Sequence, residues 1–335
     1  MADMVNFDEQ DFLRRADIVY TRRAELEAMA DRAYEDGVTN VLVCSVGGSL
    51  ATMEPFALMI DRMSDLPVRS VHAAELMAAG CNMVGPGTLV LMSSKSGDTV
   101  ETVAAARWLK ERGARIFSST GPDASPLAEL SDYDFHFGDG RPLELPFYLF
   151  VGRLLADRGS FADYADFADN LASLGGALNA VRKQFDERAV AYAHAYHAEP
   201  YHIWVASGDL WPVCYSYAMC VLEESLWIRT KSVSSPDFFH GTLELLEPGV
   251  PLTLLVGEGA TRDLDLRVAR FAEQHTDKLT VIDAADFELP GIDDRWRALL
   301  GPAVMNAALQ RISKNMEVVC KHSLDIRRYY RKEAY

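Results

Sequence analysis

The chain has 335 residues, about twice the length of an average domain, so we expect two domains. Its composition of 49% apolar and 24% charged residues is typical of globular proteins and excludes collagen-like and disordered chains. A formal net charge of −16 disfavours binding to nucleic acids and to anionic membrane surfaces. An anionic substrate would have to be held by local donors against this unfavourable overall field.

The sequence carries no sign of secretion, membrane insertion or metal binding. Its first residues are acidic and lack an apolar signal segment, and no apolar run approaches the ~18 residues of a membrane span, so we expect a cytoplasmic protein. The five cysteines never form a C-x-x-C pair, and the i,i+3 histidines His194 and His197 lack a third ligand. We therefore predict no disulfide, metal or other cofactor.

Short apolar runs alternate with helical patterns along the whole chain. A leading amphipathic helix is expected over about 8–36, a long helical stretch over about 144–197, and strands at 41–46, 67–71, 88–93, 115–120, 202–207, 251–256 and 278–283. Further helices are expected from about Ser49 and Thr99, and over about 211–228, 262–275 and 295–317. This alternation predicts mostly parallel sheets flanked by helices.

The two halves of the chain share one layout, which favours a tandem duplication. We expect a leading helix at 1–40, a first lobe at 41–160, connecting helices at 161–197 and a second lobe at 198–335. Each lobe would be a three-layer α/β/α unit built on a mostly parallel sheet.

Two loops of the first lobe are suited to binding an anion. The turn 46-VGGSLAT-52 leaves a strand and enters a helix, where glycines and free N–H groups favour an anion, although such a turn is more often only a turn. The loop 93-SSKSGDTVET-102 is more informative. It offers several hydroxyls and Lys95 at the carboxyl end of a parallel strand, whereas helix capping needs only one hydroxyl. We interpret it as a phosphate cradle.

The second loop resembles the phosphosugar-binding signature of the sugar isomerase (SIS) domain family. The pattern S-x-S-G-x-T-x-E-T follows an apolar strand, with a G-G-S turn about 45 residues upstream, and the resemblance covers roughly residues 40–140. It implies that Ser94, Lys95, Ser96 and Thr99 hold a sugar phosphate, assisted by Ser49 and, with less support, Gly48.

The second half resembles the isomerase half of glucosamine-6-phosphate synthase over residues 223–251. The resemblance places Glu224 on the catalytic base and His240 on the histidine of sugar ring opening, although His240-Gly241-Thr242 departs from the H-G-P of many relatives. The phrase HGTLELLEPGVP and the tail 327–335 are most similar to the fructoselysine- and fructosamine-6-phosphate deglycases.

The residue types fit this chemistry. A carboxylate can move protons between C1 and C2 of a sugar, and an imidazole can serve the ring oxygen at neutral pH. The alternatives are a solvated tandem glutamate at Glu224, beside its surface partner Glu223, and a capping or core histidine at His240. We favour a functional pair.

The basic tail has two interpretations. It could be a frayed terminus or, as the resemblance implies, a segment that folds back over the active site with Arg331 or Lys332 as the closing residue.

The resemblance implies a deglycase that cleaves a 6-phosphorylated N-fructosyl amino acid with water, giving glucose 6-phosphate and an amino acid. It also implies a homodimer with shared active sites and no cofactor. The alternatives are an aldose–ketose or amino-sugar phosphate isomerase or deaminase, and a non-catalytic phosphosugar-binding regulator. The amino acid released is not indicated.

Overall fold

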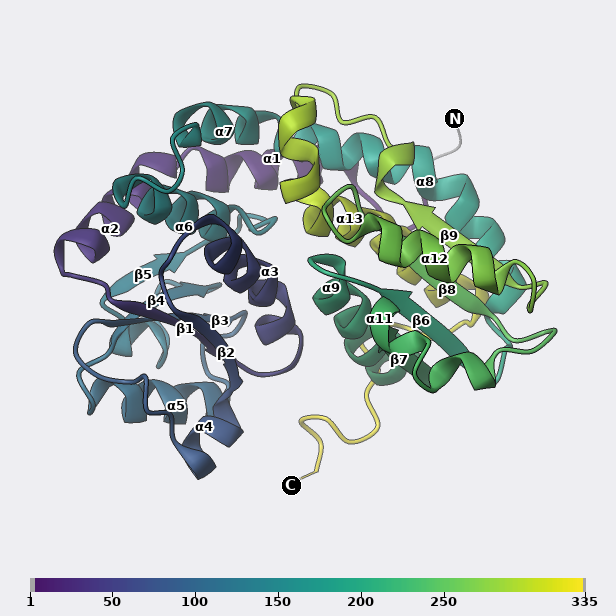
Figure 1. Ribbon diagram of the computed structural model, residues 1–335, viewed down its shortest axis with the longest axis horizontal. Helices are drawn as coiled ribbons and strands as arrows, with labels where there is room; N and C mark the ends of the chain where they lie inside the picture. The colour runs from purple at the N-terminus through teal and green to yellow at the C-terminus, as the bar shows by residue number, and fades with distance from the viewer. Residues whose placement is uncertain (1–3, 334–335) are drawn as a thin grey trace. The chain divides into compact units, whose positions relative to one another are not determined.

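The computed structural model describes residues 4–333, and these divide into two compact units (Figure 1). The N-terminal unit is Glu9–Gly175. The C-terminal unit is formed by residues 176–333 together with residues 4–8, so the chain passes between the units twice.

The N-terminal unit is built on a five-stranded parallel sheet in the order β2-β1-β3-β4-β5. Its elements are α1 (Glu9–Tyr20), α2 (Arg23–Glu35), β1 (Asn40–Ser45), α3 (Gly47–Met63), β2 (Val68–His72), α4 (Ala73–Ala79), β3 (Thr88–Ser94), α5 (Val100–Lys110), β4 (Arg115–Thr120), η1 (Ala128–Leu130), β5 (Tyr133–His136), α6 (Leu145–Asp157), α7 (Tyr164–Asn170) and η2 (Leu171–Ser173). Helices α2, α3 and α6 pack together on one face of the sheet, and α4 and α5 cover the other (Figure 1). Because both faces are covered, β1 and β3 are almost continuously apolar.

The C-terminal unit repeats this plan on a four-stranded parallel sheet in the order β7-β6-β8-β9. Its elements are α8 (Leu174–Tyr196, which begins just before the boundary), β6 (His202–Ala206), α9 (Leu210–Ser216), the π-helical segment η3 (Tyr217–Glu223), α10 (Glu224–Leu226), β7 (Thr230–Ser234), α11 (Ser235–Phe238), η4 (Thr242–Leu245), β8 (Leu252–Val256), α12 (Arg262–Ala272), β9 (Leu279–Asp283), η5 (Ala284–Asp286) and α13 (Asp294–Val319). The strand order matches β2-β1-β3-β4 of the first sheet. The predicted α/β fold with two parallel sheets is confirmed.

Three predicted helices differ from those observed. The leading helix is two helices, α1 and α2, separated by a turn in which the Thr21 hydroxyl donates to the Ile18 carbonyl at 2.9 Å. The long stretch over 144–197 contains α6, α7 and α8. The helix predicted over 211–228 changes at Tyr217 from α- to π-helical geometry.

Two strands, β5 and β7, have no counterpart among the predicted elements. Both lie at an edge of their sheet and carry polar residues, in the sequences YDFH and TKSVS. An edge strand of this kind lacks the continuous apolar run of a central strand, which explains why apolar patterning did not find them.

The N-terminal residues form a strap on the C-terminal unit. The guanidinium of Arg311, which is 1% exposed, donates to the Val5 carbonyl at 3.0 Å and pairs with Asp186 at 2.7 Å. The Asn6 amide donates to Glu317 at 3.1 Å. The strap is therefore held on α13 by polar contacts to a buried arginine and a carboxylate.

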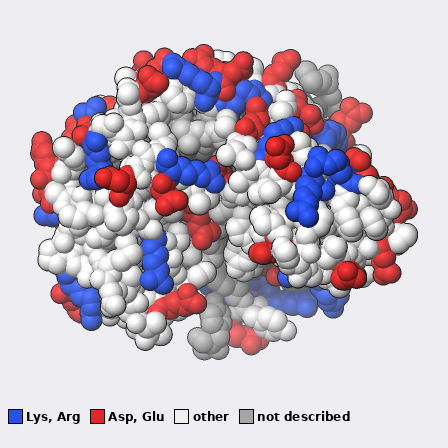
Figure 2. All heavy atoms as spheres, viewed as in Figure 1, with Lys and Arg blue, Asp and Glu red and all other residues white. Residues whose placement is uncertain are grey.

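Acidic and basic side chains are interspersed among uncharged ones on the face drawn in Figure 2. Within residues 4–333, none of the helices combines the length and the apolar character needed to cross a bilayer. Over the same residues, His, Cys, Asp and Glu side chains do not gather in threes in a way that could hold a metal ion.

His202, the first residue of β6, is a buried titratable group remote from the carboxyl ends of the strands. Its side chain is 1% exposed, and burial lowers its pKa to about 4, because the charged imidazolium loses its hydration there. As the pH falls below the ordinary histidine value of 6.5, the unfolded chain takes up this proton first, so stability is lost between about pH 6.5 and pH 4.

We expect His202→Phe to remove this part of the pH dependence. The wild-type free energy of unfolding should fall by up to about 3 kcal/mol between pH 7 and pH 4 through His202 alone, and the variant should lack that loss. Urea unfolding at a series of pH values measures it. The exposed His194→Gln is the matched control, and a variant slope equal to that of the wild type would contradict the assignment.

Candidate active site

Two helix N-termini lie at the carboxyl ends of the neighbouring strands β1 and β3. α3 starts at Gly47 directly after β1, and α5 starts at Val100 after a five-residue loop. In the described chain neither first turn has a side-chain cap, so both offer unpaired amide donors. After β1 the chain runs to β2 on one side, and after β3 it runs to β4 on the other. The carboxyl ends of β1 and β3 therefore form the switch point at which open α/β sheets bind ligands. The arrangement favours an anion.

Ser94 shapes the loop between β3 and α5. It is 2% exposed; its hydroxyl accepts from the Gly97 amide at 3.0 Å and lies 3.0 Å from the Thr99 hydroxyl. Of the four predicted residues of this loop, Ser94 is thus buried and engaged within the loop, whereas its partner Thr99 is half-buried. Its described contacts indicate a supporting role more than direct contact with a ligand.

The loop is also fixed from outside. The Gly121 amide donates to the Lys95 carbonyl at 3.1 Å, and the Leu127 amide donates to the Gly97 carbonyl at 3.0 Å. Gly97 has a φ of +70°, and a Cβ on it would lie 2.2 Å from Ser125 Oγ. Only glycine satisfies both the backbone conformation and the close approach at this position.

The remaining predicted phosphate ligands are more accessible. Lys95 is exposed and Ser96 is half-buried, with its hydroxyl donating to the Asp98 carboxylate at 2.5 Å. Gly48 and Ser49 lie half-buried in the first turn of α3. The Ser96 hydroxyl would have to rotate away from Asp98 to donate to a phosphate. The sequence did not indicate the hydrogen bond between Ser96 and Asp98.

Glu224 begins α10 immediately after the π-helical segment. Such segments are rare and occur frequently at functional sites. The side chain of Glu224 is 35% exposed, and Arg327 Nε donates to its Oε1 at 2.7 Å. Its neighbour Glu223 is exposed and accepts from the Thr230 hydroxyl at 2.5 Å. Of the tandem pair, Glu224 is the more enclosed and is held by the C-terminal tail.

A cavity of about 660 Å³ lies beside Glu224 within the C-terminal unit. Its lining joins Glu223, Glu224 and residues 227–230 to residues 327–330 of the tail. Trp227 has a φ of +61°, an unfavourable conformation for a bulky residue, and strain of this kind is found at ligand sites. The catalytic candidate therefore faces a polar and aromatic space.

His240 lies elsewhere in the same unit. It follows α11 in a turn in which its amide donates to the Asp237 carbonyl at 2.9 Å, and its side chain is exposed. It is not among the described residues that line the Glu224 cavity. Glu224 and His240 of one chain are thus not brought together in this cavity.

The tail residue that contacts Glu224 is Arg327. Arg331 and Lys332, the two closing residues suggested by resemblance, are exposed and are not among the described residues lining the cavity. Both Arg327 and Trp227 were missed as site residues. The sequence shows a run of basic side chains in the tail, but nothing in it indicates which one turns back to the carboxylate.

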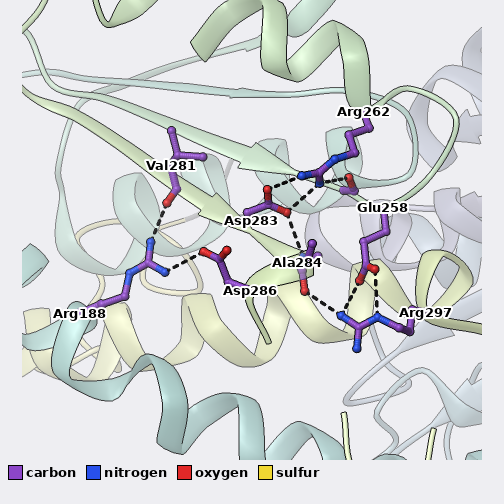
Figure 3. A network of polar contacts seen from close by, with 10 residues as sticks. Arg188, Glu258, Arg262, Val281, Asp283, Ala284, Asp286 and Arg297 are labelled. Carbon is purple, nitrogen blue, oxygen red and sulfur yellow. Dashed lines mark hydrogen bonds and ion pairs between the residues drawn. The ribbon is translucent and has the colours of Figure 1, made fainter. Parts of the chain in front are cut away.

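Ion pairs lie at the carboxyl ends of β8 and β9 in the second sheet (Figure 3). Arg262 forms two hydrogen bonds with Asp283, and Arg297 forms two with Glu258. Behind them Asp265 is 1% exposed and accepts from the Ser235 hydroxyl at 2.5 Å, and burial raises the pKa of its carboxyl.

Comparisons with known proteins agree with this architecture. Residues 38–148 match the SIS domain. The chain is 30% identical over 319 residues to a fructosamine deglycase of Bacillus subtilis, covering 93% of this chain and 97% of the relative. A Bacillus subtilis crystal structure described as a candidate phosphosugar isomerase has a TM-score of 0.90 at 29% identity, covering 94% of this chain and 99% of that one.

The C-terminal domain of glucosamine-fructose-6-phosphate aminotransferase from Francisella tularensis shares the fold, with a TM-score of 0.77 at 16% identity over 92% of this chain and 96% of that one. Two parallel α/β units, the first of which matches the SIS domain, define an SIS-domain protein. Within that class, the chain belongs to the family of the fructosamine deglycases. The predicted family is confirmed.

We expect Gly97→Ala to destabilise the loop and abolish phosphate binding. The strained φ and the collision with Ser125 should together lower the free energy of unfolding by about 2–4 kcal/mol. Gly37→Ala, which has a φ of +82° and open space around it, isolates the backbone contribution. Calorimetric titration with glucose 6-phosphate and thermal unfolding measure both effects.

Adding Ser125→Gly to Gly97→Ala should recover part of the stability, because the colliding atoms are gone. Undiminished binding of glucose 6-phosphate by Gly97→Ala would argue against the loop as the anion site.

Proposed function

We propose that the protein is a deglycase that hydrolyses a 6-phosphorylated N-fructosyl amino acid to glucose 6-phosphate and a free amino acid. The observation that carries this proposal is Glu224, a partly enclosed carboxylate held by Arg327 beside a cavity large enough for a substrate. Membership of the fructosamine deglycase family supports the same reaction.

The N-terminal unit would anchor the substrate by its phosphate. The amides that begin α3 and α5, the hydroxyls of Ser96, Thr99 and Ser49, and the Lys95 ammonium would surround the anion, with Gly48 allowing close approach. Ser94 would hold the loop in shape. Fixing the phosphate positions C1 and C2 for proton transfer and reduces the entropic part of the barrier.

Glu224 would act on the open-chain ketosamine. Its carboxylate removes a proton from C1 while the C2 carbonyl oxygen gains one, which gives an enaminol. Return of a proton to C2 converts the C1–N bond into an imine. Water then adds to C1, and cleavage of the C–N bond releases the amine and leaves the C1 aldehyde of glucose 6-phosphate. Arg327, whose Nε donates to Glu224 Oε1, would hold the carboxylate in its orientation for the first step.

His240 would assist ring opening by transferring a proton to the ring oxygen. Because His240 lies outside the Glu224 cavity of its own chain, we propose that it serves the active site of a second copy in a homodimer. Arg331 and Lys332 remain candidates for closing the site when substrate is bound.

The direct test is to incubate the purified protein with 6-phosphofructosyl-lysine, 6-phosphofructosyl-asparagine and a glucosamine-type conjugate, and to assay glucose 6-phosphate. Release from an amino-acid conjugate is expected. Isomerisation of fructose 6-phosphate without any such release would favour the isomerase alternative, and binding without turnover of any substrate would favour a regulator.

Glu224→Gln should lower kcat by about 10²–10⁴-fold, because the amide cannot accept the C1 proton. Binding of the substrate should persist, since the phosphate contacts are retained. The assay is glucose 6-phosphate release at saturating substrate. The same change at the exposed Glu273 should have no effect, and a Glu224→Gln enzyme with full kcat would remove Glu224 from this role.

Ser96→Ala should raise KM by about tenfold and change kcat little, because it removes a donor to a remote charged group. Ser131→Ala, whose hydroxyl donates to the Leu127 carbonyl at 2.8 Å, is the matched control. An unchanged KM would exclude Ser96 from the phosphate cradle.

A further inference from the structure

The cavity beside Glu224 contains more positive charge than its catalytic role requires. Three arginines line it, Arg229, Arg327 and Arg328, against the two carboxylates of Glu223 and Glu224. The chain as a whole has a charge of −16, so this local excess of cations is unusual in the molecule.

The three arginines are not equivalent. Arg327 is committed to Glu224 at 2.7 Å and to the backbone carbonyl of Ile326 at 3.0 Å. Arg229 and Arg328 form no hydrogen bond or ion pair from their side chains within the described part of the chain. Two guanidinium groups at the wall of the cavity therefore have donors available for a ligand.

Arg328 is positioned by an aromatic contact. Its guanidinium carbon lies 4.0 Å from the centre of the Trp227 ring, and the edge of His322 packs on the same indole at 4.3 Å between ring centres. A stacked guanidinium keeps its N–H groups in its own plane and free to bind a carboxylate through two bonds. The Trp227 ring thus positions the Arg328 guanidinium at the wall of the cavity that Glu224 also lines.

We propose that Arg229 and Arg328 bind the free carboxylate of the amino acid in the amine half of the substrate. This inference rests on the proposed function, which places the C1–N bond at Glu224 and the phosphate in the N-terminal unit. The aromatic side chains of Trp227, Tyr329 and Tyr330 supply a wall for the aliphatic part of the amino acid. The site selects conjugates of amino acids over conjugates of simple amines.

The experiment uses non-cleavable probes in matched pairs, so that binding is measured without turnover. The first pair is N-(1-deoxy-6-phosphoglucitol-1-yl)glycine and its methylamine counterpart. The second pair joins the same phosphosugar alcohol to the ε-nitrogen of lysine and to 1,5-diaminopentane. Within each pair both members carry the phosphate, and the carboxylate is the only group by which they differ. Calorimetry gives the dissociation constants.

The wild-type protein should bind the carboxylate member of at least one pair about tenfold more tightly or better. The pair with the larger advantage shows whether the carboxylate lies near the α- or the ε-linked nitrogen. Arg328→Gln and Arg229→Gln should each reduce that advantage by at least threefold and leave the affinity for the decarboxylated member within twofold. Arg270→Gln, an exposed arginine of α12, is the control for loss of charge.

Equal affinities within both pairs, or an advantage that survives both substitutions, would overturn the carboxylate subsite. If Arg328→Gln does not fold, Arg229→Gln and Arg328→Lys, which keeps the charge but loses the planar fork, decide the matter. Glucose 6-phosphate release from 6-phosphofructosyl-glycine and from the ε-lysine conjugate is measured in parallel. Tighter binding of the carboxylate member without release of glucose 6-phosphate would contradict the deglycase reaction and support the subsite. Release of glucose 6-phosphate without tighter binding would support the deglycase reaction and overturn the subsite.

Discussion

The parallel pairing of β1 with β3 is the constraint on which the candidate phosphate site depends. The two strands are neighbours in the sheet, yet the chain leaves them toward opposite edges, so the helices that follow begin side by side above the same pair of strand ends. The Ser45 hydroxyl links these ends by donating to the Ser93 carbonyl at 2.8 Å. A strongly acidic protein can thereby offer an anion several amide and hydroxyl donors at short range, where they outweigh a distant and screened repulsion.

The second sheet repeats the strand order of the first, but different side chains lie at the carboxyl ends of its strands. The carboxyl ends of its strands carry Glu258 and Asp283, which pair with Arg297 and Arg262, and the buried Asp265 accepts from the Ser235 hydroxyl. The two units thus repeat one order of strands with different side chains at the strand ends.

Much of the fold and part of the site could be predicted from the sequence, and the limits have physical causes. Central strands are covered on both faces, so apolar runs identify them, and the hydroxyl-rich loop is contiguous in the chain. Strands β5 and β7 were not predicted, because an edge position tolerates polar residues and these strands lack a continuous apolar run. The pairing of Arg327 with Glu224 spans 103 residues, and the engagement of Ser94 depends on how the loop closes on itself. Neither follows from residue type or spacing.

The strap of residues 4–8 bears on the order in which the chain assembles. During synthesis, residues 9–175 emerge as a complete unit with its own sheet, and domains generally fold in that order. The partners of the strap, Arg311 and Glu317, belong to the last helix and are translated some 300 residues later. Residues 4–8 can therefore form these contacts only after α13 has been synthesised, so this part of the C-terminal unit is completed late.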